Sequence, residues 1–290
     1  DKAVAAGAVA VIVSKPVTVP DDVCVITVSD TRQAMMACVP YFFDYPANRM
    51  RMVGVTGTNG KTTTTHMIRH ILKAQGRKVG VIGTVHIMIG DTSYPIHNTT
   101  PDVVDLQHIL HQMVQENVEY CVMEVSSHAL ALGRVSGVEF DTAVFTNLTQ
   151  DHLDFHKTFE NYLAAKCKLF EQVSAANQEK DNKGAVINID DSYGHRVMEK
   201  TTAPTITYST LGKGTLNASD VHMSTKNSQY TVNYKGESYP VSMNTTGLFN
   251  VYNTLAAIGA CLQEGISMEA IDTALKTFSS VPGRFELIEE

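Results

Sequence analysis

One stretch of the chain, residues 54–65, constrains the fold more than any other: it reads Gly-Val-Thr-Gly-Thr-Asn-Gly-Lys-Thr-Thr-Thr-Thr. A short apolar strand is expected directly before it, and an apolar helical face follows over residues 66–72. Strand, glycine loop and helix in this order are typical of a P-loop, whose backbone N–H groups and helix N-terminus bind phosphate. The stretch predicts a nucleoside triphosphate site, with Lys61 reaching the outer phosphates and the Thr62 hydroxyl ligating Mg²⁺.

The loop departs from the general P-loop pattern at one position. That pattern places a glycine five residues before Gly60, where this chain has Val55, flanked by Gly54 and Gly57. The loop is therefore a variant, and it indicates a subclass of phosphate-binding proteins. The alternative is a tight strand-to-helix turn without a ligand, but Gly-Lys-Thr-Thr directly after a strand argues against it.

Composition places the chain among ordinary globular proteins. Its 290 residues are 43% hydrophobic and 18% charged, which is enough for one large domain and part of another. The net charge of −7 gives no support to nucleic-acid binding, and no apolar run approaches the roughly 18 residues of a membrane span. The five cysteines form no Cys-x-x-Cys pair, which is typical of reduced thiols in a cytoplasmic protein.

Apolar strands separated by helices predict an α/β fold, with a mostly parallel P-loop sheet that helices cover on both faces. The strands expected after the loop are 79–83, 120–125, 140–147, 185–189 and 205–209, with a hairpin at 85–95 and helices at 103–117 and 158–170. Alternation over 216–243 predicts a small antiparallel patch, followed by helices at 247–264 and 268–278. Residues 1–47 are typical of the remnant of a small N-terminal α/β domain.

Polar clusters follow three of the expected strands, after Val55, Val125 and Thr146. Ligands of open α/β sheets gather at the carboxyl ends of the strands, so the clusters predict one shared site. Glu124 ends a buried strand, where a carboxylate needs a partner, and is interpreted as an Mg²⁺ ligand; a helix-capping or hydrogen-bonded carboxylate is the alternative. Residues 151–156, Asp-His-Leu-Asp-Phe-His, lack a zinc motif and taken alone are typical of a solvated loop.

Other polar residues carry little signal by themselves. Lys166 lies on an expected helix, and spacing alone would make it a surface lysine. Asn250 and Asn253 open another helix and are typical of caps. Residues 126–128, Ser-Ser-His, do not indicate a hydrolase, because adjacent side chains rarely meet and the chain has no Gly-x-Ser-x-Gly elbow.

Taken together, these motifs resemble those of the Mur ligases of peptidoglycan synthesis, and within that family the MurE type. The segments that carry the resemblance are 57–63, 98–101, 123–130, 145–154 and 250–253. They occur in order, and the resemblance covers nearly the whole chain. Folylpolyglutamate synthase and the neighbouring Mur ligases share the loop and the Asp-His pair, but Glu-Val-Ser-Ser-His and Asn-Thr-Thr-Pro favour the MurE type.

The resemblance implies a three-domain protein of which this chain is a fragment lacking both ends. Residues 1–47 would end an N-terminal uridine-nucleotide domain, and residues 48–283 would form the central P-loop ATPase domain. Residues 284–290 would begin a C-terminal domain that binds the incoming amino acid. A cytoplasmic monomer is expected, without a nucleic acid or membrane partner.

The implied activity is ATP-dependent amide ligation. The carboxylate of UDP-N-acetylmuramoyl-L-alanyl-D-glutamate attacks the γ-phosphate of ATP, which gives an acyl phosphate and releases ADP. The amine of a diamino acid then attacks the acyl phosphate, which forms the amide and releases phosphate. Because carboxylate and triphosphate repel each other, cations must hold them together. A folylpolyglutamate-synthase-like ligase and a nucleotide-binding fragment without turnover are the alternatives. The sequence does not choose between meso-diaminopimelate and L-lysine, since the selecting residues are expected beyond Glu290.

The resemblance also implies roles for individual residues. For ATP these are Gly57, Thr58, Asn59, Gly60, Lys61, Thr62, Thr63, Asn250 and Arg284. For catalysis they are Lys61, Glu124, His152 and Lys166, with Mg²⁺ held by Thr62, Glu124 and His152. For the muramoyl peptide they are Thr99, Thr100, Ser126 and Arg134. Lys166 is expected to be carbamylated, which replaces a cation by an anion and requires a locally neutral amine.

Overall fold

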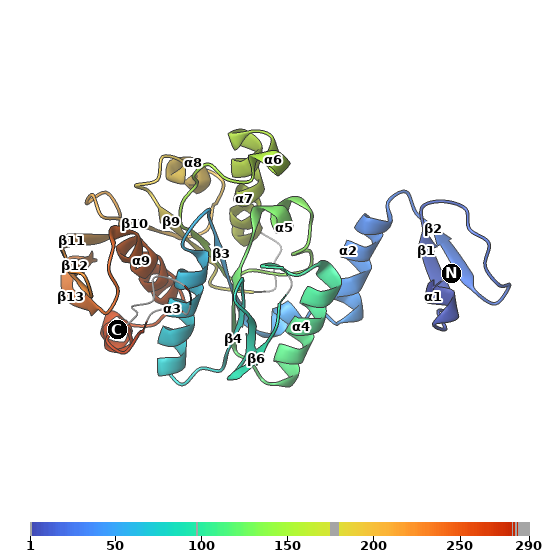
Figure 1. The fold of residues 1–290 in the computed structure, drawn as a ribbon, viewed down its shortest axis with the longest axis horizontal. Helices are drawn as coiled ribbons and strands as arrows, with labels where there is room; N and C mark the ends of the chain where they lie inside the picture. The colour runs from blue at the N-terminus through green and yellow to red at the C-terminus, as the bar shows by residue number, and fades with distance from the viewer. Residues whose placement is uncertain (1, 97, 175–179, 280, 282, 284–290) are drawn as a thin grey trace.

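The computed structural model of the chain describes residues 2–96, 98–174, 180–279, 281 and 283. A large sheet with helices on both faces forms most of it, and a small unit stands at one end (Figure 1). The strands of the large sheet are β3 (Arg51–Thr56), β4 (Val79–Ile82), β5 (Ile87–Ile89), β6 (Thr92–Tyr94), β7 (Tyr120–Glu124), β8 (Thr142–Phe145), β9 (Gly184–Asn188), β10 (Thr205–Ser209), β11 (Leu216–Met223), β12 (Ser228–Tyr234) and β13 (Glu237–Met243).

The order of these strands is β13-β12-β11-β10-β9-β8-β3-β7-β4-β5-β6. From β11 to β4 every pair is parallel, whereas β12 and β13 at one edge and β5 and β6 at the other pair antiparallel. The predicted α/β fold with a mostly parallel sheet is confirmed. The predicted antiparallel patch is confirmed as β11–β13, and it continues the main sheet because β11 also pairs with β10.

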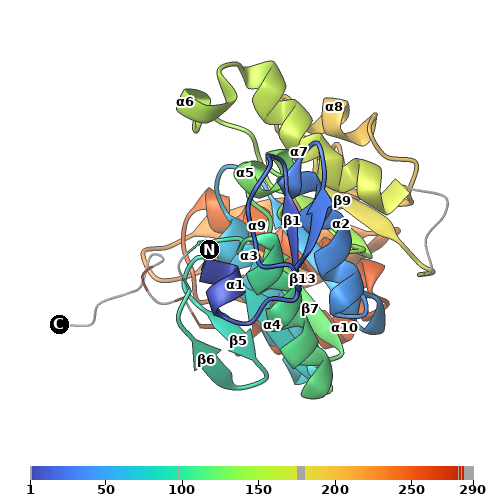
Figure 2. The same cartoon turned by 90° about the vertical axis from the view of Figure 1, so that its right-hand side faces the viewer.

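Helices cover both faces of the sheet (Figures 1 and 2). One face carries α3 (Lys61–Ala74), α9 (Leu248–Gln263) and α10 (Met268–Leu275). The other carries α4 (Val103–Gln115), α5 (Ser127–Ala131), α7 (Phe159–Ser174) and α8 (Gly194–Met198), with α6 (Leu153–His156) beside α7. Among the helices of the described residues, none combines the length and the apolar character that crossing a membrane requires.

Alternate residues of the central strands enter two different cores. In β3, Met52 packs in the core beneath α4 and α7, whereas Val53 and Val55 pack in the core beneath α3 and α9. Successive side chains of a strand point to opposite faces, so a strand covered on both faces must be apolar throughout. This is the physical reason for the continuous apolar runs that predicted the strands.

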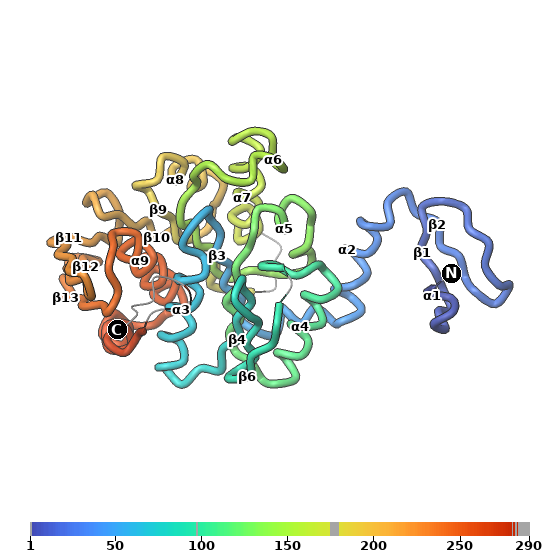
Figure 3. Tube along the Cα trace, in the orientation of Figure 1, coloured from blue at the N-terminus to red at the C-terminus, as the bar shows by residue number. Residues whose placement is uncertain are grey.

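The N-terminal unit consists of α1 (Lys2–Ala5) and a parallel pair, β1 (Ala10–Val13) and β2 (Cys24–Thr27). Figure 3 shows it at one end of the molecule and β11–β13 at the other. Helix α2 (Thr31–Phe42), capped by Asp30, connects the unit to the sheet and packs against α4. The short helix η1 (Pro46–Arg49) then leads into β3, with Pro46 and Ala47 buried.

A buried ionic cluster lies at the amino-terminal ends of the central strands β3 and β8. Asp141 is fully buried and accepts hydrogen bonds from the backbone N–H of Met52 at 2.6 Å, from Arg51 at 2.8 Å and from Lys180 at 2.8 Å. Arg51 also donates from its Nε atom to Glu264, at the end of α9, at 2.8 Å. One carboxylate thus joins a strand, a loop and, through Arg51, the helical layer.

Candidate active site

The P-loop connects β3 to α3 at the carboxyl edge of the sheet. Gly60 precedes the first residue of α3 with φ of +86°, in the left-handed region that favours glycine. A Cβ atom at Gly60 would lie 2.2 Å from Oδ1 of Asn253 in α9, so the loop backbone and α9 approach closely. The Nζ atom of Lys61 donates to the carbonyls of Gly57 at 2.9 Å and Thr58 at 2.8 Å, which places the ammonium over the loop.

Replacing Gly60 by alanine is expected to destabilise the fold more than the same change at Gly76. Both glycines have positive φ, but a Cβ at Gly76 would meet nothing within 4 Å. Gly76→Ala should cost about 1 kcal/mol for the left-handed backbone alone. Gly60→Ala should cost about 1–3 kcal/mol more, because Asn253 must move. Urea denaturation of the two variants measures the difference, and equal costs would contradict the close approach.

The loop after β8 is hydrogen-bonded to the P-loop. The N–H of Thr58 donates to the carbonyl of Asn147, and the N–H of Asn59 donates to Oδ1 of Asn147, both at 2.9 Å. The Thr146 hydroxyl donates to the carbonyl of Asn59 at 2.6 Å. These bonds occupy two backbone donors of the loop, which leaves the N–H groups at the start of α3 as the donors that a phosphate could use.

Glu124 lies at the end of β7 with 1% of its surface exposed. Its Oε1 atom accepts hydrogen bonds from the Thr62 hydroxyl at 3.0 Å and from the N–H of Thr84 at 2.7 Å, and its Oε2 atom accepts from the Thr84 hydroxyl at 3.1 Å. The donors belong to the P-loop helix and to the turn after β4, not to a helix that Glu124 precedes. Glu124 is therefore a hydrogen-bonded carboxylate, as the alternative expected, but it does not cap a helix.

The residues around Glu124 fit a hydrated Mg²⁺ ion rather than a metal cage. Within the described ranges, no three His, Cys, Asp or Glu side chains converge on a common metal position. Thr62, Glu124 and His152 do line one cavity. Proteins commonly bind Mg²⁺ through one or two carboxylates, while substrate phosphates and water complete the octahedron, and a hard oxygen donor set of this kind is present here.

His152 directly precedes α6, as its N-cap residue, with φ of +52°, a left-handed conformation that is uncommon for a non-glycine residue. Its ring packs edge-on against the ring of His128, in α5, with the centroids 4.8 Å apart. Asp151 lies 3.4 Å from its Nε2 atom. His152 also lines the cavity that contains Glu124, so the segment that taken alone is typical of a solvated loop contributes one histidine to that cavity.

Lys166 is buried, with 1% of its surface exposed, so the surface position expected from spacing alone is wrong. Its Nζ atom lies 4.4 Å from the centre of the Tyr162 ring, and the Tyr162 hydroxyl lies 3.1 Å from the Thr58 hydroxyl. Burial lowers the pKa of the Lys166 ammonium well below its ordinary value, and the charge of Lys61 lowers that pKa further. The side chain is therefore predisposed to be a neutral amine.

Of the four residues expected to contact the muramoyl peptide, Thr99 and Ser126 line a cavity beside the P-loop. This cavity of about 180 Å³ is lined by the P-loop together with Thr84, Thr99, Glu124, Ser126 and His152. The other two, Thr100 and Arg134, are not among the residues that line it. The hydroxyl of Thr100, buried, donates to the carbonyl of Glu124 at 2.9 Å. Arg134 donates to the carbonyl of Thr100 at 3.2 Å.

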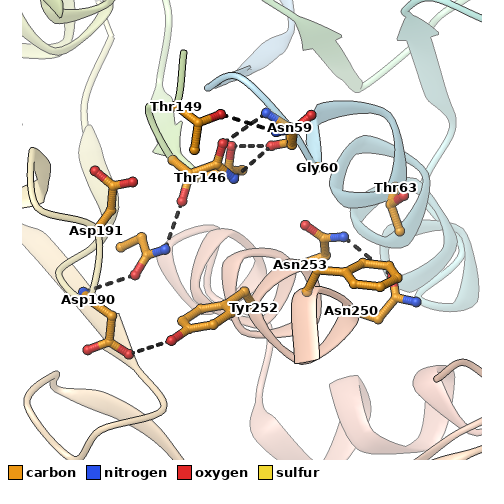
Figure 4. Close-up of a pocket in the computed structure, with 13 residues that line it drawn as sticks. Asn59, Gly60, Thr63, Thr146, Thr149, Asp190, Asp191, Asn250, Tyr252 and Asn253 are labelled. Atoms are coloured by element: carbon orange, nitrogen blue, oxygen red, sulfur yellow. Dashed lines mark hydrogen bonds between the residues drawn. The ribbon is translucent and has the colours of Figure 1, made fainter. Parts of the chain in front are cut away.

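A second, larger cavity of about 570 Å³ adjoins the P-loop on the side of α9 (Figure 4). Asn59, Gly60 and Thr63 line both cavities, and Asn250 and Asn253 of α9 line the larger one. The two asparagines, typical of caps by sequence, are buried against this cavity. Arg284, the other residue expected to contact the nucleotide, lies outside the described residues.

Asp190 and Asp191, which follow β9 and line this larger cavity, were not identified from the sequence. Asp190 accepts hydrogen bonds from the N–H of Thr210 at 2.7 Å and from the Tyr252 hydroxyl at 2.9 Å, and so ties the end of β10 to α9. Asp191 accepts from the N–H of Leu148 at 3.0 Å. The usable signal was their position directly after a buried strand, where ligands of α/β sheets gather.

Comparison with known proteins identifies a family for this arrangement. The family model described as the Mur ligase middle domain matches residues 55–261. The UDP-N-acetylmuramoyl-L-alanyl-D-glutamate--2,6-diaminopimelate ligase of Geobacillus kaustophilus is 47% identical over 100% of this chain and 59% of its own length. The corresponding ligase 1 of Clostridium acetobutylicum is 44% identical over 99% of this chain and 58% of its own length.

A solved structure of a UDP-N-acetylmuramoyl-L-alanyl-D-glutamate--2,6-diaminopimelate ligase superposes on 99% of this chain with a TM-score of 0.83 and 30% identity. The chain covers 58% of that protein, and it spans about three fifths of the length of the curated relatives named above. Fold and sequence therefore agree on one family.

Proposed function

Because the chain belongs to the Mur ligase family, we propose that it forms the ATP-binding and catalytic part of a MurE-type ligase. That ligase adds a diamino acid to UDP-N-acetylmuramoyl-L-alanyl-D-glutamate through an acyl phosphate, at the expense of ATP. The relatives of 44–47% identity, whose names state 2,6-diaminopimelate, support diaminopimelate over L-lysine as the diamino acid. A cytoplasmic, monomeric protein remains part of this proposal.

The single observation that carries the proposal is the shared cavity. Lys61 and Thr62, which serve the outer phosphates of a P-loop nucleotide, line it together with Thr99 and Ser126. A carboxylate bound at Thr99 and Ser126 would thus face the phosphate that it attacks. Holding two reactants in such a geometry supplies much of the rate enhancement of a ligase, because the entropy of bringing them together is lost beforehand.

Charge distribution supports the same reaction. A carboxylate approaching a triphosphate brings anions together, and Lys61 is the cation that this chain places over the loop. We propose that Thr62, Glu124 and His152 hold Mg²⁺, which when bound neutralises charge on the phosphates and the attacking carboxylate. The buried Glu124 carboxylate keeps the Thr62 hydroxyl oriented at the phosphate end of the loop.

We further propose that Lys166 carries a carbamate. Carbamylation begins with attack of a neutral amine on CO₂, and the burial that lowers the pKa of Lys166 provides that amine. The product is an anion close to Lys61, whose charge already acts on Lys166. The modification would therefore replace a neutral amine beside Lys61 by an anion, and so create a favourable cation–anion pair.

The larger cavity is proposed to hold the adenosine part of ATP. It continues from the P-loop along α9, and Asn250 offers an amide that hydrogen-bonds both as donor and as acceptor. Arg284 is proposed as a further nucleotide contact. The domain limits of 1–47, 48–283 and 284–290 likewise remain proposals, and α2, which packs against α4, links the first two parts.

The proposal is tested by incubating the chain with ATP, MgCl₂, UDP-N-acetylmuramoyl-L-alanyl-D-glutamate and meso-diaminopimelate or L-lysine. Calorimetry should show Mg²⁺-dependent ATP binding that Lys61→Met weakens at least about tenfold, since the outer phosphates lose their cation. Mass spectrometry of the products should show the tripeptide product, with ADP released in equal amount.

The other results discriminate between alternatives. ATP and muramoyl-dipeptide binding without any product would support a nucleotide-binding module that lacks turnover. Selective binding of a folate, with no binding of the muramoyl dipeptide, would support a folylpolyglutamate-synthase-like ligase and overturn the proposal. Absence of ATP binding would overturn the proposal and both of these alternatives.

A further inference from the structure

Thr84, in the turn after β4, connects two walls of the smaller cavity. Its N–H and its hydroxyl bind the two oxygens of Glu124, at 2.7 Å and 3.1 Å. Its hydroxyl also lies 3.1 Å from the hydroxyl of Thr99. A single threonine therefore contacts both the acid beside the P-loop and a residue on the wall proposed for the muramoyl peptide.

The chemistry of the groups determines the direction of these hydrogen bonds. An ionised carboxylate only accepts, so the one proton of the Thr84 hydroxyl goes to Oε2 of Glu124. The Thr84 oxygen then accepts the proton of the Thr99 hydroxyl. The result is a directed chain of hydrogen bonds from Thr99 through Thr84 to Glu124.

This chain also determines which part of the Glu124 carboxylate remains available. A carboxylate has about four acceptor positions. Oε1 accepts from Thr62 and from the N–H of Thr84, and Oε2 accepts from the Thr84 hydroxyl. The remaining acceptor position is on Oε2, next to the Thr84 hydroxyl. A cation at Glu124 would bind there, and the direction of Oε2 depends on that hydroxyl.

Gly83 permits the close approach of this turn to Glu124. A Cβ atom at Gly83 would lie 2.4 Å from Oε1, closer than real Cβ atoms approach an oxygen. Glycine at this position therefore lets the following N–H reach the carboxylate. The sequence Gly83-Thr84 supplies the space, the backbone donor and the side-chain donor in two consecutive residues.

We propose that Thr84 is a positioning residue, which orients Oε2 of Glu124 for the cation and couples that oxygen to Thr99 on the substrate wall. The inference rests on the proposed function, from which it takes the cation at Glu124 and the substrate at Thr99. It adds to the proposed catalytic residues one that lies outside the P-loop, outside residues 151–156 and outside α7.

The test compares Thr84→Val with Thr84→Ser in the full chain. Valine keeps the shape and the N–H but removes the hydroxyl, whereas serine keeps the hydroxyl. Electron paramagnetic resonance titration with Mn²⁺, in the presence of a non-hydrolysable ATP analogue, measures cation affinity directly. Valine should weaken Mn²⁺ binding about 10- to 100-fold, as loss of an outer partner of a ligand does, and serine should restore it to within about threefold.

Further measurements separate a positioning role from a structural one. Affinity for the ATP analogue without metal should stay within about twofold of wild type in both variants, and thermal unfolding should be unchanged. If Thr84→Val fails to fold, Thr84→Ala replaces it, since alanine also retains the N–H. Gly83→Ala should weaken Mn²⁺ binding as well, because its Cβ displaces Oε1.

The coupling to Thr99 is measured by adding Thr99→Val. Thr99→Val alone should weaken Mn²⁺ binding by about threefold, and it should have no further effect in the Thr84→Val background, where the chain is already broken. If the wild-type chain binds Mn²⁺ and Thr84→Val binds it equally well, this inference is overturned and the proposed function stays intact. No Mn²⁺ binding by the wild-type chain would instead overturn the proposed cation site.

Discussion

Replacing Lys166 by methionine is expected to remove ligase turnover and, in CO₂-free buffer, to make the chain more stable by about 1 kcal/mol. The methionine side chain fills the volume of the buried lysine stem without an ammonium that burial disfavours. Turnover should fall by about a thousandfold or more, the loss typical of removing a preorganised charged group from an active site. Function and stability would thus move in opposite directions at one residue.

The pH dependence of this effect has a definite sign. The fold lowers the pKa of Lys166 from its ordinary value of 10.5, so at neutral pH the unfolded chain holds this proton more readily than the folded chain. The resulting cost to wild-type stability is complete below the folded-state pKa and disappears as pH rises through 10.5. The stability advantage of Lys166→Met should therefore shrink between pH 7 and pH 10.

A matched control lies on the same helix. Lys168 is exposed, and Lys168→Met should change the free energy of unfolding by less than about 0.5 kcal/mol and leave turnover intact. Carbon-13 NMR with labelled bicarbonate should show a carbamate signal in wild type and in Lys168→Met but not in Lys166→Met. Wild-type turnover in Lys166→Met would eliminate the proposed role, and unchanged stability would contradict the effect of burial.

The second large effect is expected at the buried ionic cluster around Asp141, at the amino-terminal ends of β3 and β8. Asp141→Ala should lower the free energy of unfolding by about 3–5 kcal/mol, because it leaves Arg51 and Lys180 without the buried carboxylate that they share. The N–H of Met52 would also lose its partner. Affinity for ATP should be unchanged in the folded protein, since the P-loop follows the other end of β3.

An exposed ion pair provides the comparison for this prediction. Asp91 is 81% exposed where it pairs with Lys73 and Arg69, and Asp91→Ala should cost less than about 1 kcal/mol. Urea denaturation of both variants at the same ionic strength measures the two costs. A cost for Asp141→Ala no larger than that for Asp91→Ala would show that the buried cluster contributes little to stability.

Local sequence patterns were sufficient for much of the fold. The glycine loop predicted β3 and α3, because backbone freedom and helix termination act over a few residues. Continuous apolar runs predicted the parallel strands, since both faces of those strands are buried. Patterns of this kind cannot give strand order, and they missed the short helices α5 and α6, whose few residues carry no helical period.

For the candidate site, the sequence by itself determined the glycine loop between β3 and α3 and, through the carboxyl-end rule, the segments that contribute to the cavity. Only the tertiary structure decided that Lys166 is buried, that Asn147 clamps the P-loop and that Thr84 binds Glu124. Each of these depends on contacts between segments far apart in the chain. Burial and hydrogen bonding of this kind depend on which strands become neighbours in the sheet. The hydrophobic periodicity of a single segment contains no information on that strand order.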